Sequence, residues 1–120
     1  MKALFITSIG DPEKKTMGTI DMKEVPIPEP GPEEVRIKIA YASICGSDPH
    51  TLRGELGPMR PRILSRLPIR TGHEISGVID AVGEVAAANG FKVGDRVTAN
   101  YSKPCGTCYW CHTGREGLCK

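Results

Sequence analysis

The segment PCGTCYWCHTGREGLC, from Pro104 to Cys119, holds four of the five cysteines of this 120-residue chain. They are Cys105, Cys108, Cys111 and Cys119. Thiolates are soft ligands, and four of them at short spacings can enclose one zinc ion in a tetrahedron. The segment offers few apolar side chains to bury. We therefore expect a structural zinc ion, rather than a hydrophobic core, to order it.

Three other interpretations of the cysteines are weaker. Disulfides need an oxidising compartment, and residues 1–10 lack the charged, apolar and small-residue order of a secretory signal. A bacterial ferredoxin run places its fourth cysteine after three residues and before a proline, whereas seven residues separate Cys111 from Cys119 and Lys120 follows. A nucleic-acid-binding finger would carry two separated ligand pairs and a basic surface, which a net charge of +2 does not indicate.

The composition is that of one soluble globular domain. Hydrophobic residues make up 39% of the chain and charged residues 25%, and no apolar run is long enough to span a bilayer. We expect a cytoplasmic protein that binds neither a membrane nor a nucleic acid. The 14 glycines and 10 prolines favour many turns and short strands over long helices.

Short strands are expected at residues 1–7, 19–25, 35–41, 75–83 and 96–99. In the clearest of them, apolar residues from Val35 to Tyr41 alternate with Arg36, Lys38 and Ala40, which is the period of a half-buried strand. Gly77 and Gly83 suggest close backbone approaches around the fourth strand.

One short helix is expected after residue 47. Asp48 is a suitable N-cap, Pro49 suits the first helical position, and Gly54 is a suitable stop. The stretch from Arg53 to Arg70 contains five arginines and three prolines, and we expect it to be a solvated loop. The alternative is a rim over a substrate cleft, and the sequence does not decide between the two.

Three motifs then follow one another along the chain. The first is Cys45-Gly46-Ser47-Asp48-Pro49-His50. The second is Gly72-His73-Glu74, followed by Gly77, Gly83 and Ala86. The third is the set of four spaced cysteines. Together they resemble the catalytic, GroES-like domain of the zinc-dependent medium-chain alcohol dehydrogenases, over residues 1–119. The resemblance implies a mainly β fold: a partly open GroES-like β-barrel with short helices and a cysteine-rich structural zinc lobe at residues 104–119.

The resemblance also implies a catalytic zinc site. Cys45 and His73 match two of its ligands, and Glu74 matches a residue beside the metal that can transiently replace a water ligand. Asp48 matches a carboxylate that orients His73 by accepting its other ring N–H. Taken alone, Cys45 beside a turn is more typical of a buried structural cysteine, and a single histidine at a strand start is more typical of a hydrogen-bonded structural residue.

Two further residues match positions that handle a proton. Ser47 matches the hydroxyl that hydrogen-bonds the bound alcohol, and His50 matches the far end of a proton relay to solvent. The implied reaction is oxidation of an alcohol or polyol to a carbonyl, with zinc as Lewis acid and hydride transfer to NAD or NADP. Relatives commonly form oligomers through a second domain.

Parts of the family pattern are missing from these residues. No G-x-G-x-x-G follows a strand, so we expect no dinucleotide-binding Rossmann domain within residues 1–120. The third protein ligand of the catalytic zinc would lie beyond Lys120. We therefore expect a fragment that lacks turnover by itself. The alternative is a stand-alone, zinc-stabilised β-domain that acts as a binding or assembly module; a zinc-free reductase would lack both the lobe and a ligand at Cys45.

Overall fold

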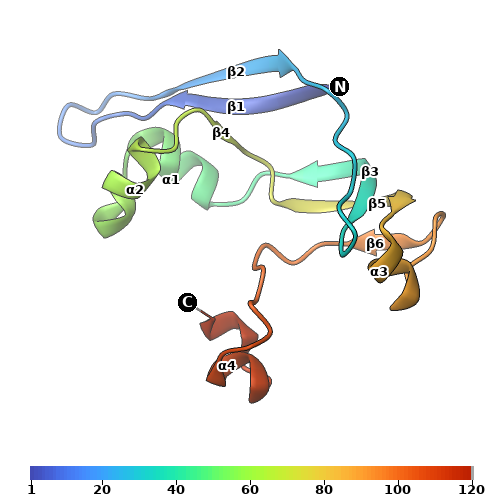
Figure 1. Cartoon of the computed structure of the whole chain (residues 1–120). Coiled ribbons are helices and arrows are strands. Elements are labelled where there is room, and N and C mark those ends of the chain that lie inside the picture. Colours follow the sequence, from blue (N-terminus) through green and yellow to red (C-terminus); the bar gives the residue numbers. More distant parts are fainter. Residues whose placement is uncertain (120) are drawn as a thin grey trace.

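The computed structural model describes residues 1–119, and its strands form two antiparallel, three-stranded sheets (Figure 1). The first has the order β2-β1-β4, with β1 at Lys2–Ser8, β2 at Thr19–Glu24 and β4 at Ile69–Arg70. The second has the order β3-β5-β6, with β3 at Val35–Ser43, β5 at Glu74–Val82 and β6 at Arg96–Thr98. The mainly β fold expected from the sequence is confirmed, and the five predicted strands lie within two residues of their expected ends.

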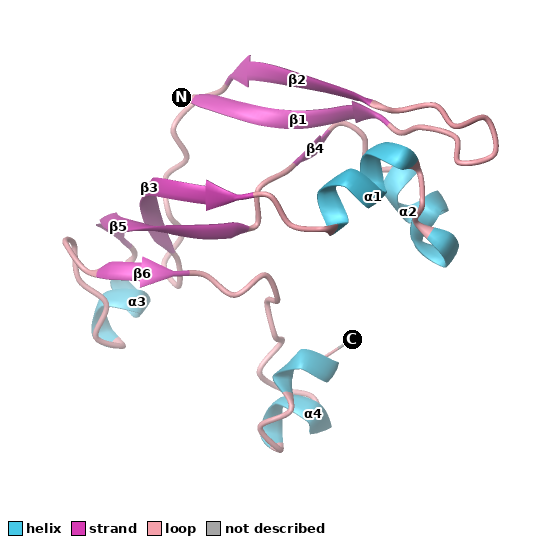
Figure 2. Ribbon diagram, turned by 180° about the vertical axis from the view of Figure 1, so that it is seen from behind, coloured by secondary structure: helices cyan, strands magenta, loops and turns pink. Residues whose placement is uncertain are grey.

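The helices are short: α1 at Ser47–Arg53, η1 at Gly57–Met59, α2 at Arg60–Leu64, α3 at Glu84–Ala88, α4 at Tyr109–His112 and η2 at Glu116–Leu118. None of the helices in the described residues is long and apolar enough to cross a membrane. In both views, α4 stands apart from the two sheets at the C-terminal end of the chain (Figures 1 and 2).

The prediction of a loop from Arg53 to Arg70 was wrong, because η1, α2 and β4 lie within it. Arg60 is one physical reason. Its partly buried guanidinium donates to the carbonyl oxygens of Gly10, at 3.2 Å, and Gly54, at 3.0 Å. These charge-assisted bonds satisfy backbone oxygens of two other segments and anchor the start of α2. Most residues of the stretch are nevertheless exposed, as expected from the sequence.

The predicted N-cap of α1 was also wrong. The helix begins at Ser47 with Gly46 as its N-cap, so Asp48 lies in the first turn. The predicted end is confirmed: Gly54 caps the helix in the left-handed region at φ 73°, where glycine carries no Cβ penalty.

The β3–β5 pair joins residues that are far apart in the sequence. Its register runs from Val35 opposite Val82 to Ser43 opposite Glu74, with two irregularities, one between Arg36 and Ile37 and one between Ile39 and Tyr41. Each irregularity shifts the side-chain alternation. The predicted half-buried alternation of residues 35–41 is therefore wrong: Arg36 is as half-buried as its apolar neighbours, while Ile39 and Tyr41 are exposed.

The hydrophobic core is small. Ile6, Ile79 and Ala86 are its buried apolar side chains among the described residues. The radius of gyration is 16.7 Å, whereas a compact domain of this length has about 14 Å. Large apolar side chains are exposed instead, including Tyr41 at 79% and Ile44 at 84%. Burial of apolar side chains therefore accounts for little of the order of this chain.

Close backbone packing contributes where the side-chain core does not. The α3 helix, which the sequence did not predict, begins after Gly83, and the backbone N–H groups of Val85 and Ala86 donate to the carbonyl oxygen of Pro32 at 2.9 and 3.1 Å. A Cβ at Gly83 would overlap the carbonyl oxygens of Gly31 and Pro32. The close approaches predicted at Gly77 and Gly83 are both confirmed.

We predict that Gly77→Ala destabilises the fold by roughly 1–3 kcal/mol, the usual cost of overpacking. The new Cβ would meet the Lys38 carbonyl oxygen and lie 2.8 Å from Cγ2 of Ile37, so β3 would have to move away from β5. Urea unfolding followed by circular dichroism measures the loss. Gly46→Ala is the control, because nothing lies within 4 Å of its Cβ and its φ of −57° suits alanine. Equal midpoints for the two variants would contradict the prediction.

Candidate functional site

Three potential metal ligands converge where β3 ends and β5 begins. The Cys45 thiol, the His73 ring and the Glu74 carboxylate each offer one ligand atom, and these atoms lie within 4.8 Å of one another. The strand register explains the convergence. Ser43 pairs with Glu74, so Cys45, two residues past the end of the ladder, faces His73, one residue before its start.

Asp48 connects the two segments that carry these ligands. Its Oδ2 accepts a hydrogen bond from the backbone N–H of Cys45 at 2.9 Å, and its Oδ1 accepts one from the Thr71 hydroxyl. Thr71 lies two residues before His73, so one carboxylate fixes the spacing of Cys45 and His73. The expected bond from the His73 ring would have to share one of these two oxygens.

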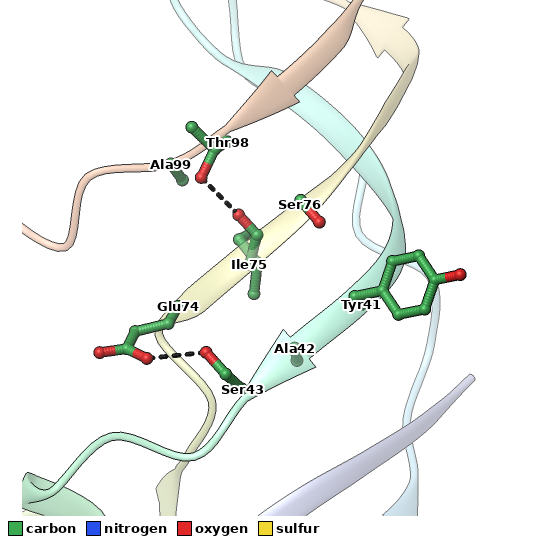
Figure 3. Close-up of a pocket in the computed structure, with 8 residues that line it drawn as sticks. All are labelled: Tyr41, Ala42, Ser43, Glu74, Ile75, Ser76, Thr98 and Ala99. Carbon is green, nitrogen blue, oxygen red and sulfur yellow. Dashed lines mark hydrogen bonds between the residues drawn. The ribbon is translucent and has the colours of Figure 1, made fainter.

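Glu74 is held by a hydroxyl from the opposite strand. Ser43 Oγ donates to Glu74 Oε2 at 2.7 Å, and Figure 3 shows the two side chains pointing toward each other. This bond lowers the pKa of Glu74 below its usual value, and a weaker contribution in the same direction comes from the hydrogen bond of the Cys45 thiol. Burial raises the pKa and only partly opposes this shift. Glu74 is therefore a carboxylate with negative charge available to a cation.

An open groove of about 590 Å³ adjoins Glu74. The groove is lined by side chains from β3, β5 and β6 and by the residue that follows β6. These are Tyr41, Ala42, Ser43, Glu74, Ile75, Ser76, Thr98 and Ala99 (Figure 3). The ring of Tyr101 approaches His73 edge-on, with the ring centroids 6.4 Å apart. Of the three candidate ligands, Glu74 lines the groove, together with aromatic, apolar and small polar side chains.

The two residues expected to move a proton lie on α1. Ser47 is exposed at the first helical position, and its carbonyl oxygen accepts a bond from Thr51 Oγ1 at 2.8 Å. The Nδ1 atom of His50 lies 2.8 Å from Glu55 Oε2, and the histidine side chain is 59% exposed. His50 is therefore in contact with solvent, as the far end of a relay would have to be.

The second candidate centre is the lobe. The four sulfur atoms of Cys105, Cys108, Cys111 and Cys119 lie within 4.8 Å of one another. The Cys111 sulfur is 3.9 Å from that of Cys105 and 3.5 Å from that of Cys108. Zn–S bonds of about 2.3 Å in a tetrahedron separate sulfurs by about 3.8 Å, whereas a disulfide needs about 2.05 Å. The spacing fits one shared ion.

The electrostatics of the lobe also fit a cation. The Thr107 hydroxyl, 3.6 Å from the Cys105 sulfur, and nearby backbone N–H groups lower the pKa of Cys105 to about 5. Burial and the Cys108 thiol raise the pKa of Cys111 to about 12. One thiol thus ionises readily while its neighbour resists a second negative charge. A bound dication removes that conflict, because zinc binds all four sulfurs as thiolates.

Sequence reasoning missed three residues that support these centres: Ser43, Thr71 and Thr107. Each is a hydroxyl whose partner is itself a predicted site residue. Only the register of β3 and β5 brings Ser43 to Glu74, and only tertiary structure brings Thr71 to Asp48. Thr107 could have been suspected from its position between Cys105 and Cys108.

Comparison with known proteins identifies relatives of this domain. Residues 31–120 match the family model described as the alcohol dehydrogenase GroES-like domain. An NAD-dependent alcohol dehydrogenase of Sulfurisphaera tokodaii is 37% identical over 99% of this chain and 32% of its own length. A sorbitol dehydrogenase of Halalkalibacterium halodurans is 40% identical over 99% of this chain and 31% of its own length. The chain thus spans about a third of these relatives.

A solved structure shows the same fold. A protein of Clostridium scindens described as a zinc-binding dehydrogenase matches with a TM-score of 0.90 and 58% identity, over 100% of this chain and 34% of its own. The family model covers three quarters of the residues here, including both candidate centres. This chain belongs to the zinc-type medium-chain alcohol dehydrogenase family, and it corresponds to the N-terminal GroES-like domain of those proteins.

Proposed function

We propose that this chain is the zinc-binding catalytic domain of an NAD(P)-dependent dehydrogenase that oxidises an alcohol or polyol to a carbonyl compound. The main observation in support of the proposal is the convergence of Cys45, His73 and Glu74, the last of which lines an open groove. A thiolate, an imidazole and a carboxylate are all ligands that zinc accepts in catalytic sites. The names of the alcohol and sorbitol dehydrogenases support the substrate class.

Different residues of this chain bind the metal and transfer the proton. Cys45, His73 and Glu74 hold the metal, which when bound supplies Lewis-acid polarisation of an alcohol oxygen. Ser47, which is exposed at the start of α1 two residues after Cys45, would accept the alcohol proton at its hydroxyl oxygen while its own hydroxyl proton leaves toward solvent. His50, on the same helix and paired with Glu55, passes the proton to solvent.

Hydride transfer requires a nicotinamide, which we assign to a Rossmann domain outside these residues. The sequence contains no glycine-rich dinucleotide fingerprint, and the relatives are about three times longer than this chain. The lobe residues Cys105, Cys108, Cys111 and Cys119 hold a structural zinc ion that orders residues 104–119. By itself the chain has no turnover.

The lobe should retain one zinc ion per chain after mild chelation, while the site at Cys45 and His73 is depleted. Four thiolates close a tetrahedron, whereas one thiolate, one imidazole and one exposed carboxylate bind more weakly. Elemental analysis after treatment with a chelator measures the content. Cys111→Ser should lose the retained ion, and His112→Ala, in the same short helix, should keep it. Two equally retained ions, or none, would contradict the assignment.

The second centre should bind cobalt in a way that depends on His73. With zinc already in the lobe, added Co²⁺ should give a thiolate charge-transfer absorption from Cys45, which His73→Ala should lose and His112→Ala should leave unchanged. Uptake that is indifferent to His73 would sink the catalytic assignment and favour the binding or assembly module.

Binding of NAD or NADP to the purified chain should be undetectable by calorimetry. The sequence contains no G-x-G-x-x-G, and among the described residues the β5–Gly83–α3 turn has a helix of only five residues. The backbone N–H groups of Val85 and Ala86 at its start already donate to the Pro32 carbonyl oxygen. Millimolar or tighter binding would show that these residues contain a nucleotide site. It would refute the assignment of nicotinamide binding to a separate Rossmann domain.

A further inference from the structure

We propose that Ser43 is a positioning residue that holds the Glu74 carboxylate in place for metal binding. The inference rests on the proposed metal site at Cys45, His73 and Glu74. Ser43 occupies the last pair of the β3–β5 ladder, directly opposite Glu74, and its Oγ donates to Glu74 Oε2 at 2.7 Å (Figure 3). Neither the family match nor the names of the relatives assigns a role to this hydroxyl.

Glu74 needs such a partner because it is exposed. An exposed glutamate samples several rotamers, and binding a metal through one of them costs conformational entropy. The Ser43 bond uses one lone pair of Oε2, and an ionised carboxylate has further lone pairs on both oxygens with which to bind a metal. The same carboxylate already lies within reach of the Cys45 thiol and the His73 ring. The side chain is therefore selected in the rotamer that the site requires, before a metal arrives.

The position of Ser43 also explains why this hydroxyl, and not another of the groove, acts on Glu74. Ser76 pairs with Tyr41 and Thr98, and Thr98 donates its hydroxyl to the Ile75 carbonyl oxygen at 2.9 Å. Ser43 pairs with Glu74 itself and lies two residues before Cys45. A single strand end thus supplies both a metal ligand and the group that orients a second ligand.

The test compares Co²⁺ affinity at the second centre, with zinc in the lobe, by the cobalt absorption described above. Ser43→Ala should weaken the affinity about 10-fold, in the range found when partners of metal ligands are removed. Ser43→Thr keeps the hydroxyl and should retain the parent affinity. Ser8→Ala is the control, since it removes a cross-strand serine hydroxyl in the other sheet, which bonds the hydroxyl and the backbone N–H of Thr19.

A double-mutant cycle separates positioning from a general effect on the fold. In a Glu74→Ala background, Ser43→Ala should cause no further loss of cobalt affinity. An equal loss in both backgrounds, or an unchanged or tighter affinity in Ser43→Ala alone, would overturn the inference. If cobalt uptake by the unsubstituted chain is lost in His73→Ala but unchanged in Ser43→Ala, only the inference about Ser43 fails. If the parent shows no His73-dependent uptake, the proposed function fails with it.

Discussion

The register of β3 and β5 is the constraint on which the candidate catalytic site depends. Cys45 and His73 are 28 positions apart in the chain, and the antiparallel pairing of Ser43 with Glu74 brings their side chains together. A slip of one residue would turn Glu74 to the other face of the sheet and move Cys45 away from His73. Asp48 reinforces this register from outside the ladder, because it binds the Cys45 backbone and the Thr71 hydroxyl at once.

The lobe obtains its order in a different way. Its four sulfurs come from fifteen consecutive residues, so loops and short helices are enough to bring them together. Closing short loops costs little conformational entropy. Four ionised cysteines held close together repel one another, however, so the cluster is stable as thiolates only when a cation balances their negative charge. One centre therefore depends on long-range sheet pairing, and the other on local chain geometry and a metal.

Much of this could be read from the sequence because the relevant signals are local. The five strands and the stop of α1 at Gly54 follow from alternation and turn residues. The candidate ligands Cys45, His73 and Glu74 came from the resemblance of their motifs to a known family, and they stay a prediction. The errors have tertiary causes. Two irregularities in β3 cancel the burial pattern that its alternation predicts, and Arg60 orders a segment whose composition suggests a loop. Ser43, the partner of Glu74, could be recognised only once the strand register was known, and Thr71, the partner of Asp48, only from the tertiary structure.

Placement of the ligands and exclusion of solvent are separate requirements, and the structure satisfies only the first. Cys45 is preceded by Ile44, which is 84% exposed, and His73 meets Tyr101, which is 81% exposed. Electrostatic interactions in a site strengthen when water is excluded, because the effective dielectric falls. These apolar side chains can lower the dielectric around the ligands only when another surface covers them. The strand register therefore sets which groups meet a metal, and the covering of Ile44 and Tyr101 sets how strongly those groups act on a substrate.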